Sequence, residues 1–144
     1  MANPKIKILL ADDQLEIVET VARLLKDEFD VIAAVSNGNR VMETASRLAP
    51  DVLVLDISMP DMNGIEAAAR LKESGFKARV IFLTVNEDPC IVEGALLIGA
   101  SGYVLKERLA TDLIPAIRQA LQGRVFVSAM KPADRNRWPQ PVVT

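Results

Sequence analysis

Five short segments of the chain are continuously apolar and lack the alternation of a half-exposed strand. They are rich in Val, Ile and Leu, a composition typical of parallel sheets that are covered on both faces. We therefore expect five strands in the interior of the protein. These segments are IKILLA (6–11), DVIAAVS (30–36), DVLVLDI (51–57), ARVIFLT (78–84) and GYVLK (102–106).

Between these segments, apolar residues recur at the spacing of an amphipathic helix. Pro50, Gly75, Gly99 and Gly123 follow helical patterns, and such residues commonly end helices. A strand followed by a helix, repeated five times, predicts an α/β domain with a parallel sheet and helices on both faces. The residues expected to face the sheet include Leu15, Val18, Val21, Ala22 and Leu25; Val41, Ala45 and Leu48; Ile65, Ala68, Ala69 and Leu71; and Leu109, Leu113, Ile117 and Leu121.

Size and composition indicate one compact domain. The chain has 144 residues, of which 50% are hydrophobic, enough for a single sizeable core. We place this domain at residues 1–123. Residues 124–144 contain three prolines and no periodic pattern, so we expect a packed stub followed by a linker-like tail. Trp138 in this tail is expected to be a local anchor or disordered, and not a ligand-stacking residue.

Charge and the rarest residue types narrow the possible functions. A net charge of −2 provides no positive field for nucleic acid, and no apolar run approaches the ~20 residues that cross a bilayer. Cys90 is the single cysteine and cannot form an intramolecular disulfide, which favours a reducing cytoplasm. The chain has no histidine, which excludes histidine-based triads and phosphohistidine chemistry on the chain itself.

Carboxylates stand where two of the predicted strands end. Asp12 and Asp13 follow the first strand, and Asp56 lies near the end of the third. In a doubly wound sheet of order 2-1-3-4-5, the first and third strands flank the point where strand order reverses, and ligands bind there. Three carboxylates in one crevice either take up protons or bind a hard cation, and Mg²⁺ accepts a few carboxylates together with water and phosphate oxygens.

Two further polar residues end the remaining strands. Thr84 closes the fourth strand and Lys106 the fifth, which adds a hydroxyl and a cation suited to phosphoryl oxygens. A carboxylate can act as nucleophile and form an aspartyl-phosphate, and Asp56 is the best candidate because it stands between the acid pair and these two groups. Alone, Asp12 and Asp13 could simply cap a helix, but the shared position of all five residues favours a functional site.

At these residues the sequence resembles the receiver domain of bacterial two-component response regulators, a family with the flavodoxin-like (βα)5 fold. The resemblance covers roughly residues 5–123. It rests on "ADD" after the first strand, "LDISMPDMNG" around Asp56, "FLT" at the fourth strand and "GASGYVLK" at the fifth. The last motif and Val85 are most similar to the branch whose receivers usually precede a LuxR-type helix-turn-helix DNA-binding domain.

The resemblance implies a role for each matching position. Asp56 would be the phosphoacceptor, with Mg²⁺ held by Asp12, Asp13, Asp56 and the main-chain carbonyl of Ser58. Lys106 and Thr84 would bind phosphoryl oxygens, and Tyr103 would be the aromatic switch residue, although an aromatic in a strand is ordinarily part of the core. The phosphoryl donor would be a phosphohistidine on a sensor histidine kinase or a phosphotransfer protein.

Two other functions remain open at this point. A Mg²⁺-dependent phosphatase or phosphotransferase would need a second carboxylate close behind its aspartyl nucleophile, where this chain has Ser58. A flavin or nucleotide module would need a Gly-rich or hydroxyl-rich loop after the first strand, where "ADDQLE" offers acids. We therefore expect a signalling switch with at most weak autodephosphorylation, and not a metabolic enzyme.

The helix expected after Thr84 presents an unusual apolar pair. Its sheet-facing side would consist of Ile91, Val92, Ala95, Leu96 and Gly99. Helical geometry then directs Leu97 outward and leaves Ile98 at the margin. We expect these two residues to form part of an interface with a protein output partner or a second copy of the chain. Only about twenty residues follow the last predicted helix, so we expect no DNA-binding domain in this chain.

Overall fold

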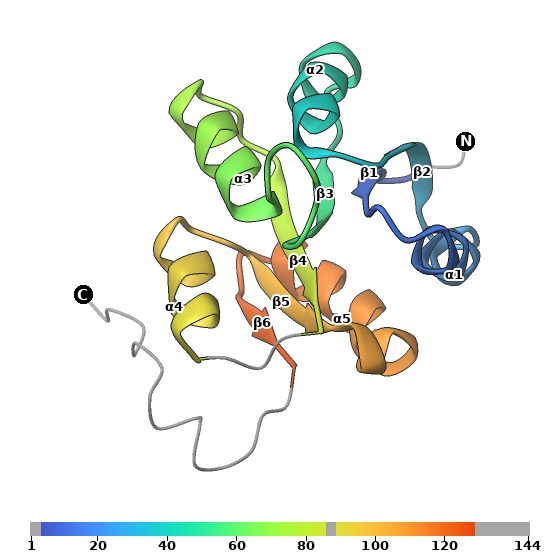
Figure 1. The fold of residues 1–144 in the computed structure, drawn as a ribbon. Coiled ribbons are helices and arrows are strands. Elements are labelled where there is room, and N and C mark those ends of the chain that lie inside the picture. Colours follow the sequence, from blue (N-terminus) through green and yellow to red (C-terminus); the bar gives the residue numbers. More distant parts are fainter. Residues whose placement is uncertain (1–3, 86–88, 129–144) are drawn as a thin grey trace.

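The computed structural model describes residues 4–85 and 89–128 of the chain. Within these ranges the strands form one parallel sheet of order β2-β1-β3-β4-β5-β6, and Figure 1 shows the strands in this succession. This is the expected flavodoxin-like arrangement with one further strand at the edge. The strands are β1 (Lys7–Ala11), β2 (Asp30–Val35), β3 (Val52–Asp56), β4 (Arg79–Thr84), β5 (Gly102–Leu105) and β6 (Phe126–Val127).

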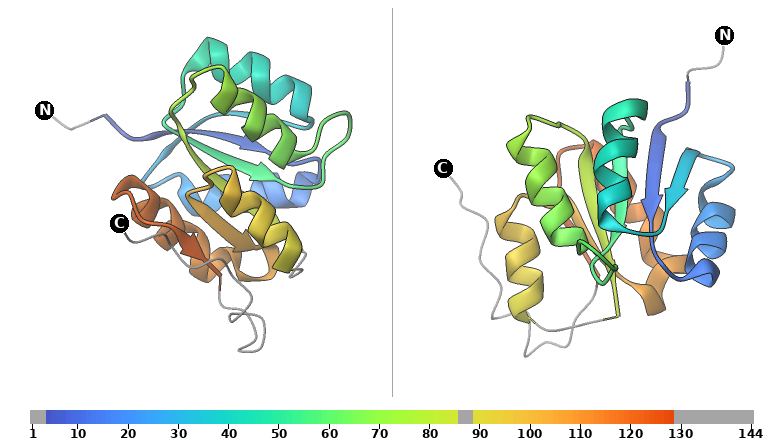
Figure 2. Two further views of the ribbon diagram at one scale, coloured as in Figure 1. Left: turned by 90° about the vertical axis from the view of Figure 1, so that its left-hand side faces the viewer. Right: turned by 45° about the horizontal axis from the view of Figure 1, so that its top comes forward.

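Helices cover both faces of the sheet, because each parallel connection must cross back over it (Figures 1 and 2). Two buried clusters lie between these layers: α1 and α5 pack on one face, and α2, α3 and α4 on the other. A short 3₁₀ turn, η1 (Lys106–Arg108), joins β5 to α5. The helices are α1 (Leu15–Leu25), α2 (Gly38–Leu48), α3 (Gly64–Glu73), α4 (Pro89–Leu97) and α5 (Leu109–Leu121).

Local sequence explains where several of the helices begin and end. Asn37 and Asn63 precede α2 and α3, and each side chain accepts a hydrogen bond from a backbone N–H in the first helical turn. Gly75, Gly99 and Gly123 adopt positive φ just beyond helix ends, as expected from the sequence. Gly99 is exposed, so its predicted place on the sheet-facing side of α4 is wrong.

Three predictions of burial fail, one of them at Leu121, the last residue of α5, which is 36% exposed. The second strand was expected to be fully buried, yet β2 is only half-buried because it forms the edge of the sheet beside β1 alone. Leu15 was expected to face the core, but it is 70% exposed in the first turn of α1. Helical spacing identifies which face of α1 is apolar. It does not show that the first turn, which carries Leu15, projects beyond the sheet.

The segment after α5 adds a strand that the sequence pattern did not reveal. Phe126 and Val127 form β6, which pairs in parallel with Gly102 and Tyr103 of β5. A strand of two residues is too short for periodicity to indicate. The tail beyond residue 128, including Trp138, lies outside the described residues. No helix in the described ranges is long and apolar enough to cross a membrane.

Candidate functional site

The register of the central strands brings two carboxylates together. Ala11 of β1 pairs with Leu55 of β3, so Asp12 and Asp56 are the next residues on adjacent strands. Asp12 is 2% exposed and Asp56 is 3% exposed, whereas the neighbouring Asp13 is exposed. The sequence prediction that these acids share the carboxyl edge of the sheet is therefore consistent with the geometry.

Lys106 lies between these two carboxylates. Its Nζ is 2.9 Å from Oδ2 of Asp12 and 3.2 Å from Oδ2 of Asp56. The same ammonium donates a hydrogen bond to Oε1 of Gln14 at 2.9 Å. The Lys106 side chain is only 8% exposed, so these charges interact with little screening by water.

Backbone N–H groups hold each carboxylate from the other side. Oδ1 of Asp56 accepts a hydrogen bond from the N–H of Ser58 at 3.1 Å, and Oδ1 of Asp12 accepts one from the N–H of Gln14 at 2.8 Å. One oxygen of each carboxylate is thus fixed by the chain, while the other faces Lys106. This arrangement orients both carboxyl groups toward the same crevice.

Asp56 keeps its proton to a higher pH than an ordinary aspartate does, because its pKa is raised. Burial, followed by the negative charge of Asp12, raises the pKa of Asp56 from 3.8 to about 6, although Lys106 and the N–H of Ser58 act in the opposite direction. One lysine therefore does not fully compensate two buried carboxylates. The site has an excess of negative charge that a second cation would relieve.

The donor set fits Mg²⁺. Carboxylate oxygens of Asp12, Asp13 and Asp56 all lie within 4.8 Å of one another. Oδ2 of Asp12 is buried and accepts no hydrogen bond from the described residues, since its contact with Lys106 is an ion pair without hydrogen-bond geometry. A hard cation with oxygen ligands would use this acceptor. The role of the Ser58 carbonyl as a further ligand stays a prediction.

The acid cluster is reachable from solvent on its Asp13 side. A cavity of about 590 Å³ lies beside Asp12 and Asp13, and Leu15, Val18 and Arg40 also line it. The first turn of α1, which carries the exposed Leu15, forms part of the rim of this cavity. Water or a hydrated cation can approach Asp12 and Asp13 from this direction.

Thr84 and Tyr103 lie on the neighbouring strands and are both buried. Thr84 is 3% exposed at the end of β4, where it pairs with Leu105 of β5, the residue before Lys106. Tyr103 is 1% exposed and packs in the cluster beneath α4. Side chains alternate along a strand, so Thr84 projects to the same face as Phe82 and its partner Tyr103. A shift of Thr84 would therefore reach the face that α4 covers.

The loop between β3 and α3 is packed tightly against Asp56. A Cβ atom on Gly64 would lie 2.2 Å from the carbonyl oxygen of Asp56, so only glycine permits α3 to begin there. The N–H of Gly64 donates to the carbonyl of Ile57 at 2.9 Å. Met59 and Met62 in this loop are buried. These contacts fix the main chain on which Asp56 is carried.

Gln14 also lies at this site, although no sequence pattern predicts it. A glutamine at the start of a helix is usually an ordinary surface residue, and no pattern in the sequence indicates that Lys106 would reach it. The signal is its position directly after Asp12 and Asp13, which brings its amide to the rim of the crevice. Gln14 contributes both a backbone donor to Asp12 and a side-chain acceptor to Lys106.

The apolar pair at the end of α4 lies as expected from helical geometry, with Leu97 the last residue of the helix and Ile98 directly after it. Leu97 is 74% exposed, and Ile98 is half-buried and packs against the core beneath α4. Val92 and Ala95 are buried on the sheet-facing side, with Ile91 and Leu96 partly buried beside them. Leu97 therefore stands on the outer surface of α4.

Together, a doubly wound parallel sheet and a crevice of three acids and one lysine define an α/β domain whose donor set fits a hard cation. Residues 8–118 match the response regulator receiver domain, and the chain belongs to this family.

Relatives agree with this assignment. The chain is 38% identical over 136 residues to the transcriptional regulatory protein LnrK of Bacillus subtilis, covering 92% of this chain and 62% of LnrK. It is 36% identical to the nitrate/nitrite response regulator protein NarL of Escherichia coli, covering 84% of this chain and 57% of NarL. The chain thus spans less than two thirds of these relatives.

Solved structures lead to the same family. The signal receiver domain of NarL from Mycobacterium tuberculosis has a TM-score of 0.81 at 30% identity, covering 85% of this chain and 100% of that domain. The non-phosphorylated receiver domain of the stress response regulator RcsB from Escherichia coli also has a TM-score of 0.81, at 25% identity, covering 87% of this chain and 99% of that domain. The predicted family and fold are confirmed.

Proposed function

We propose that this receiver is phosphorylated on Asp56 with the help of Mg²⁺, and that the phosphoryl group changes the affinity of the α4 surface for a protein partner. The observation that carries the proposal is the position of Lys106, 3.2 Å from Asp56 and 2.9 Å from Asp12. A phosphoryl group on Asp56 would meet this ammonium directly. The donor is a phosphohistidine on a sensor histidine kinase or a phosphotransfer protein.

The residues divide the chemistry among them. The carboxylate of Asp56 is the nucleophile; it forms the new bond to phosphorus while the bond between phosphorus and the donor atom breaks. The N–H of Ser58 holds one oxygen of Asp56 and so fixes the plane of the carboxylate. Asp12, Asp13 and Asp56 would hold Mg²⁺, with Ser58 as a further ligand, and the ion when bound would neutralise charge on the transferring phosphoryl oxygens.

Lys106 and Thr84 then stabilise the product. The Lys106 ammonium exchanges its contact with the Asp56 carboxylate for a contact with a phosphoryl oxygen, and Thr84 supplies a hydroxyl donor from the end of β4. Drawing Thr84 toward the phosphoryl group opens space on the α4 face of the sheet, and Tyr103 moves toward it. Coupling of this kind is typically worth ~1–3 kcal/mol, which shifts a population without making the switch absolute.

The output surface in this proposal includes Leu97 and Ile98. Leu97 is exposed on the outer side of α4, and Ile98 joins it to the core that contains Tyr103. The partner is a protein output partner or a second copy of this chain. We place this activity in the cytoplasm, in keeping with the single Cys90.

Turnover of free phosphorylated substrates is disfavoured. Ser58 occupies the position two residues beyond Asp56, and it contributes a backbone N–H to the nucleophile in place of a second carboxylate. That position therefore offers no general acid to protonate a leaving group. The same geometry allows slow hydrolysis of the aspartyl-phosphate by water, which would return the switch to its resting state.

The experiment that tests this proposal is intact-mass measurement after incubation with acetyl phosphate. The parent is measured with Mg²⁺ and with a chelator, and Asp56→Asn is measured with Mg²⁺. We expect the parent with Mg²⁺ alone to gain the mass of one phosphoryl group. A gain of the same size in Asp56→Asn would show that another residue is the acceptor, and no gain in any sample would overturn the proposal.

A further inference from the structure

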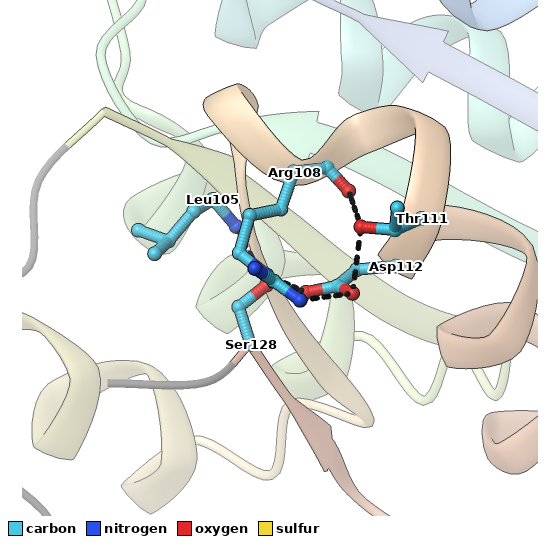
Figure 3. A network of polar contacts seen from close by, with 5 residues as sticks. All are labelled: Leu105, Arg108, Thr111, Asp112 and Ser128. Atoms are coloured by element: carbon cyan, nitrogen blue, oxygen red, sulfur yellow. Dashed lines mark hydrogen bonds and ion pairs between the residues drawn. The ribbon is translucent and has the colours of Figure 1, made fainter. Parts of the chain in front are cut away.

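Ser128 is the last described residue after α5, and its side chain is buried, with the residue only 1% exposed. Its Oγ donates a hydrogen bond to Oδ2 of Asp112 at 2.7 Å and accepts one from the backbone N–H of Leu105 at 3.0 Å. Its own N–H donates to the carbonyl of Tyr103 at 2.9 Å. Figure 3 shows Ser128 between the end of β5 and the first turn of α5. The chain after the last helix is thus bonded to the strand that leads into Lys106.

Asp112 gives this serine a fixed orientation. Its carboxylate is buried and also accepts hydrogen bonds from Nε of Arg108 at 2.8 Å and Oγ1 of Thr111 at 3.1 Å (Figure 3). Burial alone would raise the pKa of Asp112, but these donors and Ser128 outweigh it, so the pKa lies below its ordinary value. The charged carboxylate accepts the hydroxyl hydrogen of Ser128, which leaves the serine lone pairs for the N–H of Leu105.

The hydroxyl of Ser128 extends the β5–β6 ladder by one step. The paired residues of these strands end at Tyr103 and Val127, and the N–H of Ser128 makes the next main-chain hydrogen bond, to the carbonyl of Tyr103. Leu105 is the next residue whose N–H faces the same side, and it bonds to the hydroxyl of Ser128 in place of a main-chain carbonyl. Leu105 is 2% exposed, so without Ser128 this N–H would be buried with no acceptor from the segment after α5.

We propose that Ser128 is a positioning residue for the phosphorylation site, which holds the end of β5 so that Lys106 stays in contact with Asp56 and Asp12. This inference rests on the proposed function and adds the strand after the last helix to the groups that support it. Ser128 acts through Leu105, the residue that immediately precedes Lys106. In this proposal the segment after α5 contributes to the geometry of the phosphorylation site, because it fixes the residue before Lys106.

The test compares Ser128→Ala with the parent and with Ser74→Ala in the full chain. Ser74 is a control for the loss of a serine hydroxyl, because its Oγ also donates a hydrogen bond, to the carbonyl of Leu71 at 2.7 Å, at the exposed end of α3 remote from the site. Each protein is treated with acetyl phosphate over a range of Mg²⁺ concentrations, and phosphoryl uptake is followed by intact mass. Thermal unfolding of each protein confirms that it is folded.

We expect Ser128→Ala to lower the maximal rate of phosphorylation about fivefold, the factor that corresponds to one ordinary hydrogen bond. The half-saturating Mg²⁺ concentration should not rise, because Asp12 and Asp13 are intact and a looser Lys106 competes less with the metal, and Ser74→Ala should behave as the parent. Equal maximal rates for Ser128→Ala and the parent would overturn this inference alone. An equal loss in Ser74→Ala would also overturn it, since the effect would then be general destabilisation. A parent that takes up no phosphoryl group would overturn the proposed function as well.

Amide hydrogen exchange in the parent keeps the inference testable if Ser128→Ala does not fold. Binding at Lys106 and the hydrogen bond at Leu105 should stabilise each other, because coupling between two sites is reciprocal. Exchange at Leu105 should therefore slow when Mg²⁺ and beryllofluoride, a phosphoryl mimic, are added. Unchanged exchange at Leu105, with the mimic bound, would contradict the role of Ser128.

Discussion

Lys106 Nζ lies 3.2 Å from Oδ2 of Asp56, although β4 separates their strands in the sheet. A long side chain therefore spans one strand to reach the carboxylate. The same ammonium also contacts Asp12, so a single cation serves two buried acids. In the unphosphorylated protein, the Lys106 ammonium therefore stabilises both buried carboxylates.

Replacing the carboxylate of Asp56 by a neutral group should stabilise the protein when no metal is present. The pKa of Asp56 is raised from 3.8 to about 6, so the folded state binds its proton more tightly than the unfolded chain does. Stability is therefore lost as the pH rises from about 4 to 6, and the charged Asp56 costs about 1–3 kcal/mol at pH 7. Asp56→Asn should raise the free energy of unfolding by that amount in urea denaturation with a chelator present. Equal stability of the two proteins at pH 7 would contradict this account.

Lys106→Met should separate metal binding from phosphorylation. Without the ammonium, the charges of Asp12 and Asp56 have no competing cation, so Mg²⁺ should bind about tenfold more tightly, as measured by titration calorimetry. Phosphorylation by acetyl phosphate should nevertheless become much slower, because no ammonium remains to meet the phosphoryl oxygens. Weaker Mg²⁺ binding in Lys106→Met would show that Lys106 does not compete with the metal.

Two glycine substitutions should change stability in opposite directions. Gly64→Ala places a Cβ 2.2 Å from the carbonyl oxygen of Asp56, and the backbone shift that relieves this overlap should cost about 1–3 kcal/mol and slow phosphorylation.

A Cβ on Gly94 in α4 would meet no heavy atom of another element within 4 Å, so Gly94→Ala should stabilise the protein by about 0.5–1 kcal/mol. Thermal and urea unfolding measure both effects. A tolerated Gly64→Ala would mean that α3 is not fixed against Asp56.

Leu97→Glu should weaken self-association or partner binding without unfolding the domain, since Leu97 is 74% exposed. Sedimentation of the parent and Leu97→Glu, each with and without beryllofluoride, measures the oligomeric state. Leu121→Glu is the control, because Leu121 is 36% exposed on α5, which packs on the opposite face of the sheet from α4. Identical sedimentation in all samples, together with unchanged partner binding, would remove Leu97 from the interface.

The fold was largely predictable because its strands are continuously apolar and its helices amphipathic, so each element is specified by its own residues. The position of the acids was predictable for a related reason: parallel strands present their carboxyl ends at one edge. Asp12, Asp56 and Lys106 therefore converge as expected.

The missed features depend on contacts between distant segments. Gln14 reaches Lys106 through a side-chain conformation, and Ser128 reaches Leu105 because two residues of β6 pair with β5. Neither contact leaves a periodic pattern in the sequence. The exposure of Leu15 is missed for a different reason, since helical spacing defines the face of a helix and not how far the sheet extends beneath it.

The most direct test of the central claim is to locate the phosphoryl group itself. The parent is phosphorylated with acetyl phosphate and Mg²⁺ and then reduced with borohydride, which converts an aspartyl-phosphate to homoserine, and the peptides are sequenced by mass spectrometry. We predict homoserine at position 56 and at no other aspartate. Homoserine at position 12 or 13, or at none of the aspartates, would contradict the assignment of Asp56 as the phosphoacceptor.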